Sequence, residues 1–204
     1  MNWSNAPVGT HQLYAKSSNV NGIVSVSELR TVTVNSVNPP SSVGAELLTS
    51  GGTTGALRND FTGWVGFEFK VGNTPITISA LGRYVVSGSS GAHAVKLVTI
   101  SGVSNGTDVP GGSVVINTQG AESSKYAYAT LASPVTLQAN TTYVLVSQET
   151  INGDRWYDYG NNGITLTTDA TAINAAWVVN NFNTYNFTNS GAQTYGPVNL
   201  KYTK

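Results

Sequence analysis

Cysteine is absent from this chain of 204 residues, and charged side chains are scarce. Without cysteine there is no disulfide and no thiolate metal site, and the chain is compatible with any redox compartment. Charged residues make up 10% of the sequence, against roughly 25% in an average globular protein. Ten acidic and ten basic side chains give a net charge of zero, which removes the general electrostatic case for binding nucleic acid.

Long apolar runs and an export signal are missing as well. No apolar stretch approaches the roughly 18 residues of a membrane span, so we expect no membrane insertion. The start Met1-Asn2-Trp3-Ser4 lacks the basic and apolar regions of a signal peptide and reads as mid-domain sequence, so we expect a fragment from which any export signal has been cut away. A surface of Ser, Thr, Asn and Gly is typical of secreted bacterial β modules and surface fibres, which predicts a secreted or cell-surface location.

The residue pattern predicts an all-β fold. Apolar residues make up 40% of the chain, and β-branched residues dominate the apolar positions between frequent glycines and prolines. Period-two alternation predicts strands at 11–16, 24–34, 64–71, 76–86, 94–100, 113–117, 126–131, 135–137, 142–148, 164–167, 176–179, 185–187 and 198–202. A helical turn is considered at one place only, around 170–176.

Two of these strands carry the argument for a sandwich. In 64–71, Phe67 and Phe69 alternate with Glu68 and Lys70, so one face is apolar. In 142–148 both faces are apolar, which predicts a central strand. Short strands separated by turn residues every 8–15 positions favour an antiparallel β-sandwich.

A polar, proline-bearing stretch at 35–42 predicts a linker between two parts. We therefore expect a short segment at 1–38 and a sandwich module at 39–204. The sequence of each part resembles a different family of domains.

Residues 3–35 carry Trp3 before Ala6-Pro7-Val8-Gly9-Thr10, then a strand, a polar turn and a closing Val32-Thr33-Val34. This pattern resembles the C-terminal part of a bacterial immunoglobulin-like domain. The match covers only the last two or three strands of such a domain. The resemblance implies a partial immunoglobulin-like β segment.

Residues 43–204 contain Gly66-Phe67-Glu68-Phe69, Ala80-Leu81-Gly82-Arg83-Tyr84, Gly91-Ala92-His93-Ala94-Val95, Pro134-Val135-Thr136-Leu137 and Thr141-Thr142-Tyr143 in that order. This order resembles an accessory β-sandwich module of large secreted bacterial proteins, including polysaccharide-active enzymes. The resemblance implies a jelly-roll-like sandwich and a carbohydrate-binding context. It extends over about 100 residues and ends near Tyr159.

The segment 149–159 is the strongest candidate site. It holds four charged residues and three aromatic residues in eleven positions, and it follows the predicted central strand. In one interpretation Trp156 or Tyr157 stacks on a sugar ring while Glu149, Asp154 and Arg155 bond to its hydroxyls, because an aromatic face fits the CH face of a pyranose.

Two other interpretations of this segment remain open. In one, Trp156 and Tyr157 fill the end of the sandwich and the charges pair with each other. In the other, Glu149, Asp154 and Asp158 bind a structural calcium ion together with carbonyl groups of Asn161 or Asn162. No other cofactor is expected.

Three further side chains outside this segment are candidates for a binding or a structural role. His93 shares its strand face with Val95 and Leu97, so a half-buried histidine bonded to a loop competes with a ligand contact. Trp64 shares a face with Glu68 and is expected to be exposed, as a sugar platform or as the cover of a domain contact. Trp177, among Ala and Val, is expected in the core.

Together these patterns predict a non-catalytic carbohydrate-binding accessory module of a larger protein, with a polysaccharide and the adjacent domains of the parent protein as partners. No nucleophile motif is present, and no insertion that would form a catalytic cleft is visible. The alternative is a structural or adhesive subunit of a stalk or fibre, in which unpaired strands of residues 10–35 associate with another copy.

Overall fold

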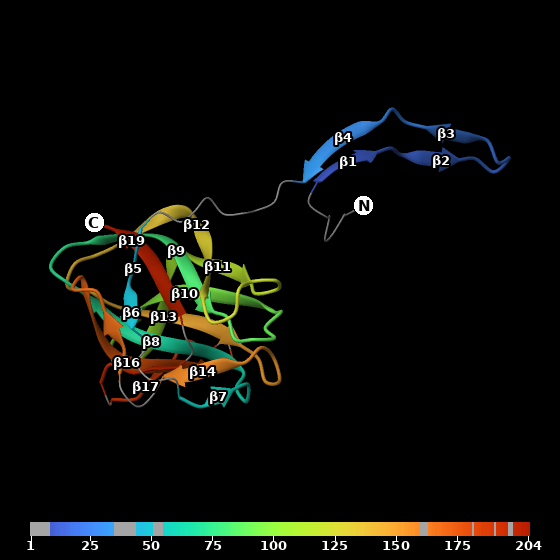
Figure 1. The fold of residues 1–204 in the computed structure, drawn as a ribbon. Helices are drawn as coiled ribbons and strands as arrows, with labels where there is room; N and C mark the ends of the chain where they lie inside the picture. Colours follow the sequence, from blue (N-terminus) through green and yellow to red (C-terminus); the bar gives the residue numbers. More distant parts are fainter. Residues whose placement is uncertain are drawn as a thin grey trace. The chain divides into compact units, whose positions relative to one another are not determined.

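The computed structural model describes residues 9–34, 44–50, 55–159, 163–180, 182–189, 191–195 and 198–204 (Figure 1). The chain forms two compact units, residues 1–39 and 40–204, and each is described by itself. The predicted linker at 35–42 lies outside the described residues. In the described parts every regular element is a strand, and none of them contains a helix that could cross a membrane.

The described part of the first unit is a long antiparallel hairpin. β1 (Gly9–Leu13) pairs with β4 (Arg30–Val34), and β2 (Lys16–Ser18) pairs with β3 (Val24–Val26). The predicted strands at 11–16 and 24–34 are therefore each interrupted. Large apolar side chains of the hairpin are exposed: Leu13, Tyr14, Val20, Ile23, Val24, Val26, Leu29 and Val32.

The second unit is an antiparallel sandwich of two main sheets (Figure 1). The larger sheet has the order β11-β10-β13-β8-β16-β17, with β8 (Gly63–Val71), β10 (Ala92–Ser101), β11 (Asn105–Asn117), β13 (Thr142–Glu149), β16 (Ala170–Val179) and β17 (Asn186–Phe187). The smaller sheet has the order β12-β9-β19-β5, with β5 (Ala45–Glu46), β9 (Ile76–Tyr84), β12 (Tyr126–Leu137) and β19 (Val198–Thr203). The predicted all-β sandwich is confirmed.

Two small sheets complete the unit. One has the order β18-β14-β7, with β7 (Leu57–Arg58), β14 (Trp156–Tyr159) and β18 (Thr194–Tyr195). The other pairs β6 (Leu48–Ser50) with β15 (Thr165–Leu166). The strand β14 is the last part of the segment 149–159 that the sequence singles out.

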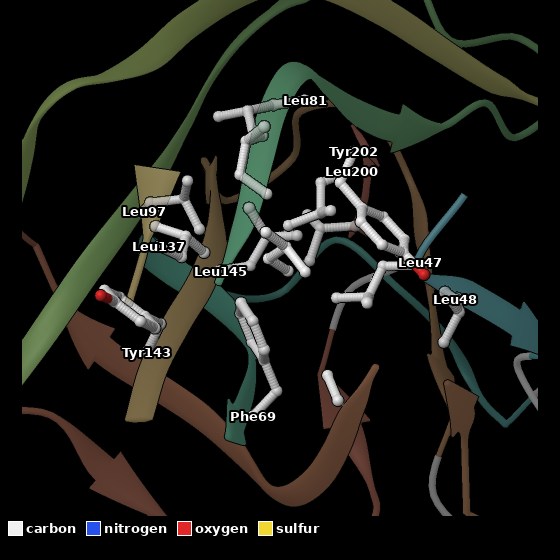
Figure 2. Packing of buried hydrophobic residues seen from close by; sticks show 14 of the residues in the cluster. Leu47, Leu48, Phe69, Leu81, Leu97, Leu137, Tyr143, Leu145, Leu200 and Tyr202 are labelled. Carbon is white, nitrogen blue, oxygen red and sulfur yellow. The ribbon is translucent and has the colours of Figure 1, made fainter. Parts of the chain in front are cut away.

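The main core lies between the two large sheets. Alternation places Phe67 and Phe69 of β8 beside Tyr143 and Leu145 of β13 on the inner face. Figure 2 shows side chains of both sheets packed there, including Leu81 of the smaller sheet. Burial of large aliphatic and aromatic side chains contributes about 1.5–3 kcal/mol each, so this layer is the main source of stability.

The outer face of the larger sheet carries a second apolar cluster. It consists of Trp64, Val98, Val144, Val146, Ala176, Val178 and Tyr185. The segment before β17 lies across it, because the amide of Tyr185 donates to the carbonyl of Ser104 at 2.8 Å. The strand β13 is therefore apolar on both faces and paired on both edges, which confirms its predicted central place.

Two expectations are corrected by these strands. The stretch around 170–176 is not a helical turn but the first part of β16, where pairing with β8 outweighs the helix preference of its alanines. The expected exposure of Trp64 is also wrong. Its side chain is 9% exposed, and the ammonium of Lys96 lies 4.3 Å from the centre of its ring.

Candidate functional site

The end of the sandwich where β13 leaves the larger sheet holds a buried pair of opposite charges. Arg83 of β9 and Glu149, the last residue of β13, have side chains that are 1% and 2% exposed. The Arg83 guanidinium donates from Nε to Glu149 Oε1 at 3.0 Å and from its terminal nitrogen to Oε2 at 2.9 Å. This bidentate geometry satisfies both carboxylate oxygens inside the core.

The same guanidinium also holds the following loop. It donates to the carbonyl of Tyr84 at 3.0 Å and to the carbonyl of Arg155 at 3.4 Å. Arg155 immediately precedes Trp156, so Arg83 connects the smaller sheet to the start of β14.

His93 of β10 lies between two carboxylates. Its Nδ1 is 3.0 Å from the carbonyl oxygen of Gln148 and 3.3 Å from Glu149 Oε2, while its Nε2 is 3.0 Å from Asp154 Oδ2. Every one of these partners is a hydrogen-bond acceptor, so both ring nitrogens must carry a proton for all contacts to be favourable. The geometry therefore favours the imidazolium form.

Asp154 ties the loop after β13 to the loop before β10. Its carboxylate accepts from the amides of Ser90 and Gly91, from the Thr118 hydroxyl at 2.8 Å and from His93. We call Arg83, Glu149, His93 and Asp154 the charge network. Its two positive and two negative groups sum to zero, which is how four ionisable side chains can share one low-dielectric site.

The pKa values in the charge network follow from these contacts. Burial lowers the pKa of His93, but the hydrogen bond and the charge of Glu149 outweigh it, so the pKa lies above its ordinary 6.5. Burial raises the pKa of Glu149 and of Asp154. The bonds from His93 and Arg83 overcome this for Glu149, and those from His93, Ser90 and Gly91 do so for Asp154, so both lie below their ordinary values.

The three side chains expected to bind calcium do not converge on one point, because they contact different partners. Glu149 and Asp154 face His93, whereas Asp158 lies 3.5 Å from the guanidinium of Arg58. Across the described ranges no group of three or more His, Asp or Glu side chains is arranged to hold a metal ion. The proposed carbonyl ligands of Asn161 and Asn162 lie outside the described residues, and the three carboxylates themselves have protein partners.

Trp156 is buried, at 1% exposed, so the expectation that it forms an open platform at the surface does not describe its position. Arg58, its partner on β7, places its guanidinium carbon 4.8 Å from the centre of the Trp156 ring. The indole Nε1 is buried and has no hydrogen-bond partner among the residues that the structure describes. The neighbour Tyr157 turns to the other face of β14, where its ring contacts Tyr84 edge-on.

Trp156 lines a pocket of about 150 Å³ at this end of the sandwich. The lining residues are Arg58, Phe61, Val65, Trp156, Trp177 and Tyr195, and we call this space the aromatic pocket. Val65 and Trp177 are cross-strand partners on β8 and β16, while Arg58, Trp156 and Tyr195 belong to the small sheet β18-β14-β7. The pocket therefore lies between the larger sheet and this small sheet.

Most of the pocket was not recognised from the sequence. Arg58, Phe61 and Tyr195 lie in short segments without alternation, and Trp177 was expected in the core. Trp177 is instead half-buried and meets the Tyr195 ring edge-on, with ring centres 5.3 Å apart. Arg155 is exposed and lines a separate polar hollow with Asp154 and Ser89.

A second group of aromatic side chains lies on the smaller sheet. Tyr84 and Tyr126 are cross-strand partners with ring centres 5.3 Å apart, and Tyr128 follows Tyr126 at 6.0 Å. Tyr84 also contacts Tyr157 of β14 at 6.4 Å. We call these four residues the tyrosine row. They are half-buried, so the row presents ring edges and parts of faces rather than an enclosed site.

The chain was compared with protein-family models, with curated proteins and with solved structures. None of the three comparisons finds a match. The function is therefore argued from the site alone.

Proposed function

We propose that the second unit is a non-catalytic carbohydrate-binding module and that the aromatic pocket holds one ring of a glycan. The observation that carries this proposal is the buried Trp156 Nε1–H. It has no partner in the described part of the chain and belongs to a side chain that lines an aromatic pocket. A buried donor without a partner is rare in proteins and destabilising, and a ligand hydroxyl satisfies it.

The composition of the pocket supports a sugar. Four of its six lining side chains are aromatic, and an aromatic face fits the CH face of a pyranose. Arg58 supplies donors for ring hydroxyls beside these faces. The volume of about 150 Å³ is below the roughly 300–1,000 Å³ of pockets that enclose drug-sized ligands, so the pocket suits one ring rather than a long chain.

Binding without bond cleavage is the better proposal for this site. The carboxylates of Asp60 and Asp158 are both ion-paired to Arg58, which lines the pocket. Neither of them lines the pocket, whereas hydrolysis needs two carboxylates on either side of the glycosidic bond. Affinity at one pocket is modest, so the module acts through attachment to further binding or catalytic domains.

The test is affinity electrophoresis and calorimetry against a polysaccharide panel. Trp177→Ala is the main variant, because this half-buried side chain can be removed with less damage than Trp156, and it should weaken binding about tenfold. Trp64→Phe is the matched control, since Trp64 is buried in the cluster on the other face of the larger sheet.

Two outcomes contradict the proposal in different ways. If the wild type binds no glycan, the function is wrong. If it binds and Tyr126→Ala abolishes retention while Trp177→Ala does not, the function stands but the glycan lies on the tyrosine row.

A second function is favoured by the first unit. Its hairpin is only two strands wide, with β1 on β4 and β2 on β3, and eight large apolar side chains are exposed among its described residues. A two-stranded hairpin by itself is marginally stable in water. We propose as the alternative that these strands pair with another copy in a surface stalk or fibre. Light scattering after size-exclusion chromatography tests this. Oligomers that disappear on deletion of residues 1–38 favour assembly, and a strict monomer in both forms contradicts it.

A further inference from the structure

The charge around the aromatic pocket is set by Arg58 and its two partners. Arg58 Nε lies 2.9 Å from Asp60 Oδ1, and a terminal nitrogen lies 3.5 Å from Asp158 Oδ2. One positive and two negative groups give this cluster a net charge of −1. The guanidinium thus has more negative charge beside it than it can neutralise.

Two aromatic rings also hold Arg58 in position. Its guanidinium carbon lies 4.8 Å from the centre of the Trp156 ring and 5.9 Å from that of Tyr195. Aromatic faces attract cations, so these two rings and the two carboxylates hold Arg58 in one place. The side chain is 30% exposed and lines the aromatic pocket.

We infer that the aromatic pocket selects uncharged or amine-bearing sugar rings and rejects sugars that carry a carboxylate, an inference that rests on the proposed carbohydrate-binding function. An acidic sugar brings a third carboxylate to one guanidinium, or it must displace Asp60 or Asp158. An amine-bearing ring instead adds its positive charge to a cluster of net charge −1 and to aromatic faces. Like charges placed together are a common way in which sites reject a wrong ligand.

The size of this selection follows from Coulomb's law. A unit charge about 5 Å from a net charge of −1, at an effective dielectric between that of a protein surface and water, changes affinity about fivefold. Salt screens the effect, since the Debye length falls to about 3 Å at 1 M. We therefore expect uronic acids to bind about fivefold more weakly than the neutral sugar at low salt and nearly as well as it at 1 M NaCl.

The experiment uses the full chain and monitors indole N–H signals by NMR, because the chain has four tryptophans. Trp156→Phe assigns the Trp156 signal. The probes are matched sets with one ring shape each: glucose, glucuronic acid and glucosamine, and the corresponding galactose and mannose sets. The neutral and amine-bearing members should shift the Trp156 signal at lower concentration than the uronic acid.

Asp60→Asn tests the cause of the selection. Asp60 is 66% exposed, so this change alters charge with little effect on folding, and it should bring the uronic acid to within about twofold of the neutral sugar. Glu122→Gln removes the same charge from a side chain that is 70% exposed and paired with Lys125 elsewhere, and it should leave the selection unchanged.

The outcomes separate the inference from the function on which it rests. If no sugar of any set shifts the Trp156 signal, the carbohydrate-binding function fails and the charge selection fails with it. If the three members of a set bind equally, the function stands and the selection is wrong. If the uronic acid binds more weakly but Asp60→Asn and Glu122→Gln act alike, the charge cluster is not its cause.

Discussion

Glu149→Gln is the sharpest test of how the candidate site is built. The substitution keeps the shape of the side chain and removes its charge. It leaves the Arg83 guanidinium, which is 1% exposed, without a counter-ion inside the core. One of its two bonds from Arg83 can persist to the amide oxygen, but the other must face an NH₂ group that is itself a donor.

The expected loss of stability is large because the pair is buried. Removing one partner of a buried ion pair destabilises a protein by about 3–5 kcal/mol, since the remaining charge is uncompensated. Loss of a charge-assisted hydrogen bond gives a consistent figure of about 1.5–3 kcal/mol for each bond. For a unit of this size, these values correspond to a fall in Tm of roughly 10 °C.

Chemical denaturation followed by tryptophan fluorescence measures the effect, because Trp64, Trp156 and Trp177 all report on the second unit. Glu122→Gln, at an exposed ion pair, is the control and should change stability by less than about 0.5 kcal/mol. The double variant Arg83→Met with Glu149→Leu should be more stable than the sum of its single variants implies. A loss below about 1 kcal/mol for Glu149→Gln would refute the buried pair.

Three further predictions concern other parts of the chain. The pKa of His93 is raised in the folded protein, so protonated His93 stabilises the fold fully below pH 6.5, and this stabilisation is lost as the pH rises through the folded pKa. Melting curves should therefore show that His93→Gln lowers stability most near pH 6 and least near pH 9. Gly66→Ala should destabilise the second unit by more than about 2 kcal/mol in denaturation, because an added Cβ would collide with the Leu145 carbonyl oxygen, and a loss below about 0.5 kcal/mol would contradict this packing. Amide hydrogens of residues 9–34 should exchange far faster than those of β13 in dilute protein, and protection that rises with concentration would favour pairing between copies.

The strands of the sandwich were predictable because their signal is local. Alternation in β8 and the two apolar faces of β13 each come from fewer than ten consecutive residues. The stretch at 170–176 was not, since alanine is compatible with a helix and only pairing with β8 decides for a strand. Its neighbour in space is about 100 residues away in the sequence.

Only part of the charge network could be predicted from the sequence. His93 was expected on the apolar face of its strand, and it lies there at 6% exposed. From the sequence, Glu149 is expected just after the predicted strand 142–148, whereas it is the last residue of β13. It continues the inward positions of Tyr143, Leu145 and Ser147, so the same alternation extended by one residue pair places it inside. Alternation along one strand cannot identify the ion-pair partner of Glu149, because Arg83 comes from a strand of the other sheet.

The charged residues of the segment 149–159 and the aromatic pocket therefore have different roles, one structural and one proposed for binding. From the sequence both roles were placed in the segment itself. The charges at 149 and 154 are held by Arg83 and His93, and Arg83 also bonds to the carbonyl before Trp156. They fix where β14 begins and so place Trp156 against Arg58. Apart from Trp156 itself, the groups available to a ligand come from four other segments of the chain, which no local pattern connects. They meet because β7, β8, β16 and β18 supply side chains around that one tryptophan. A dense cluster of charge in a low-charge sequence thus indicated the right end of the sandwich, but for a structural reason.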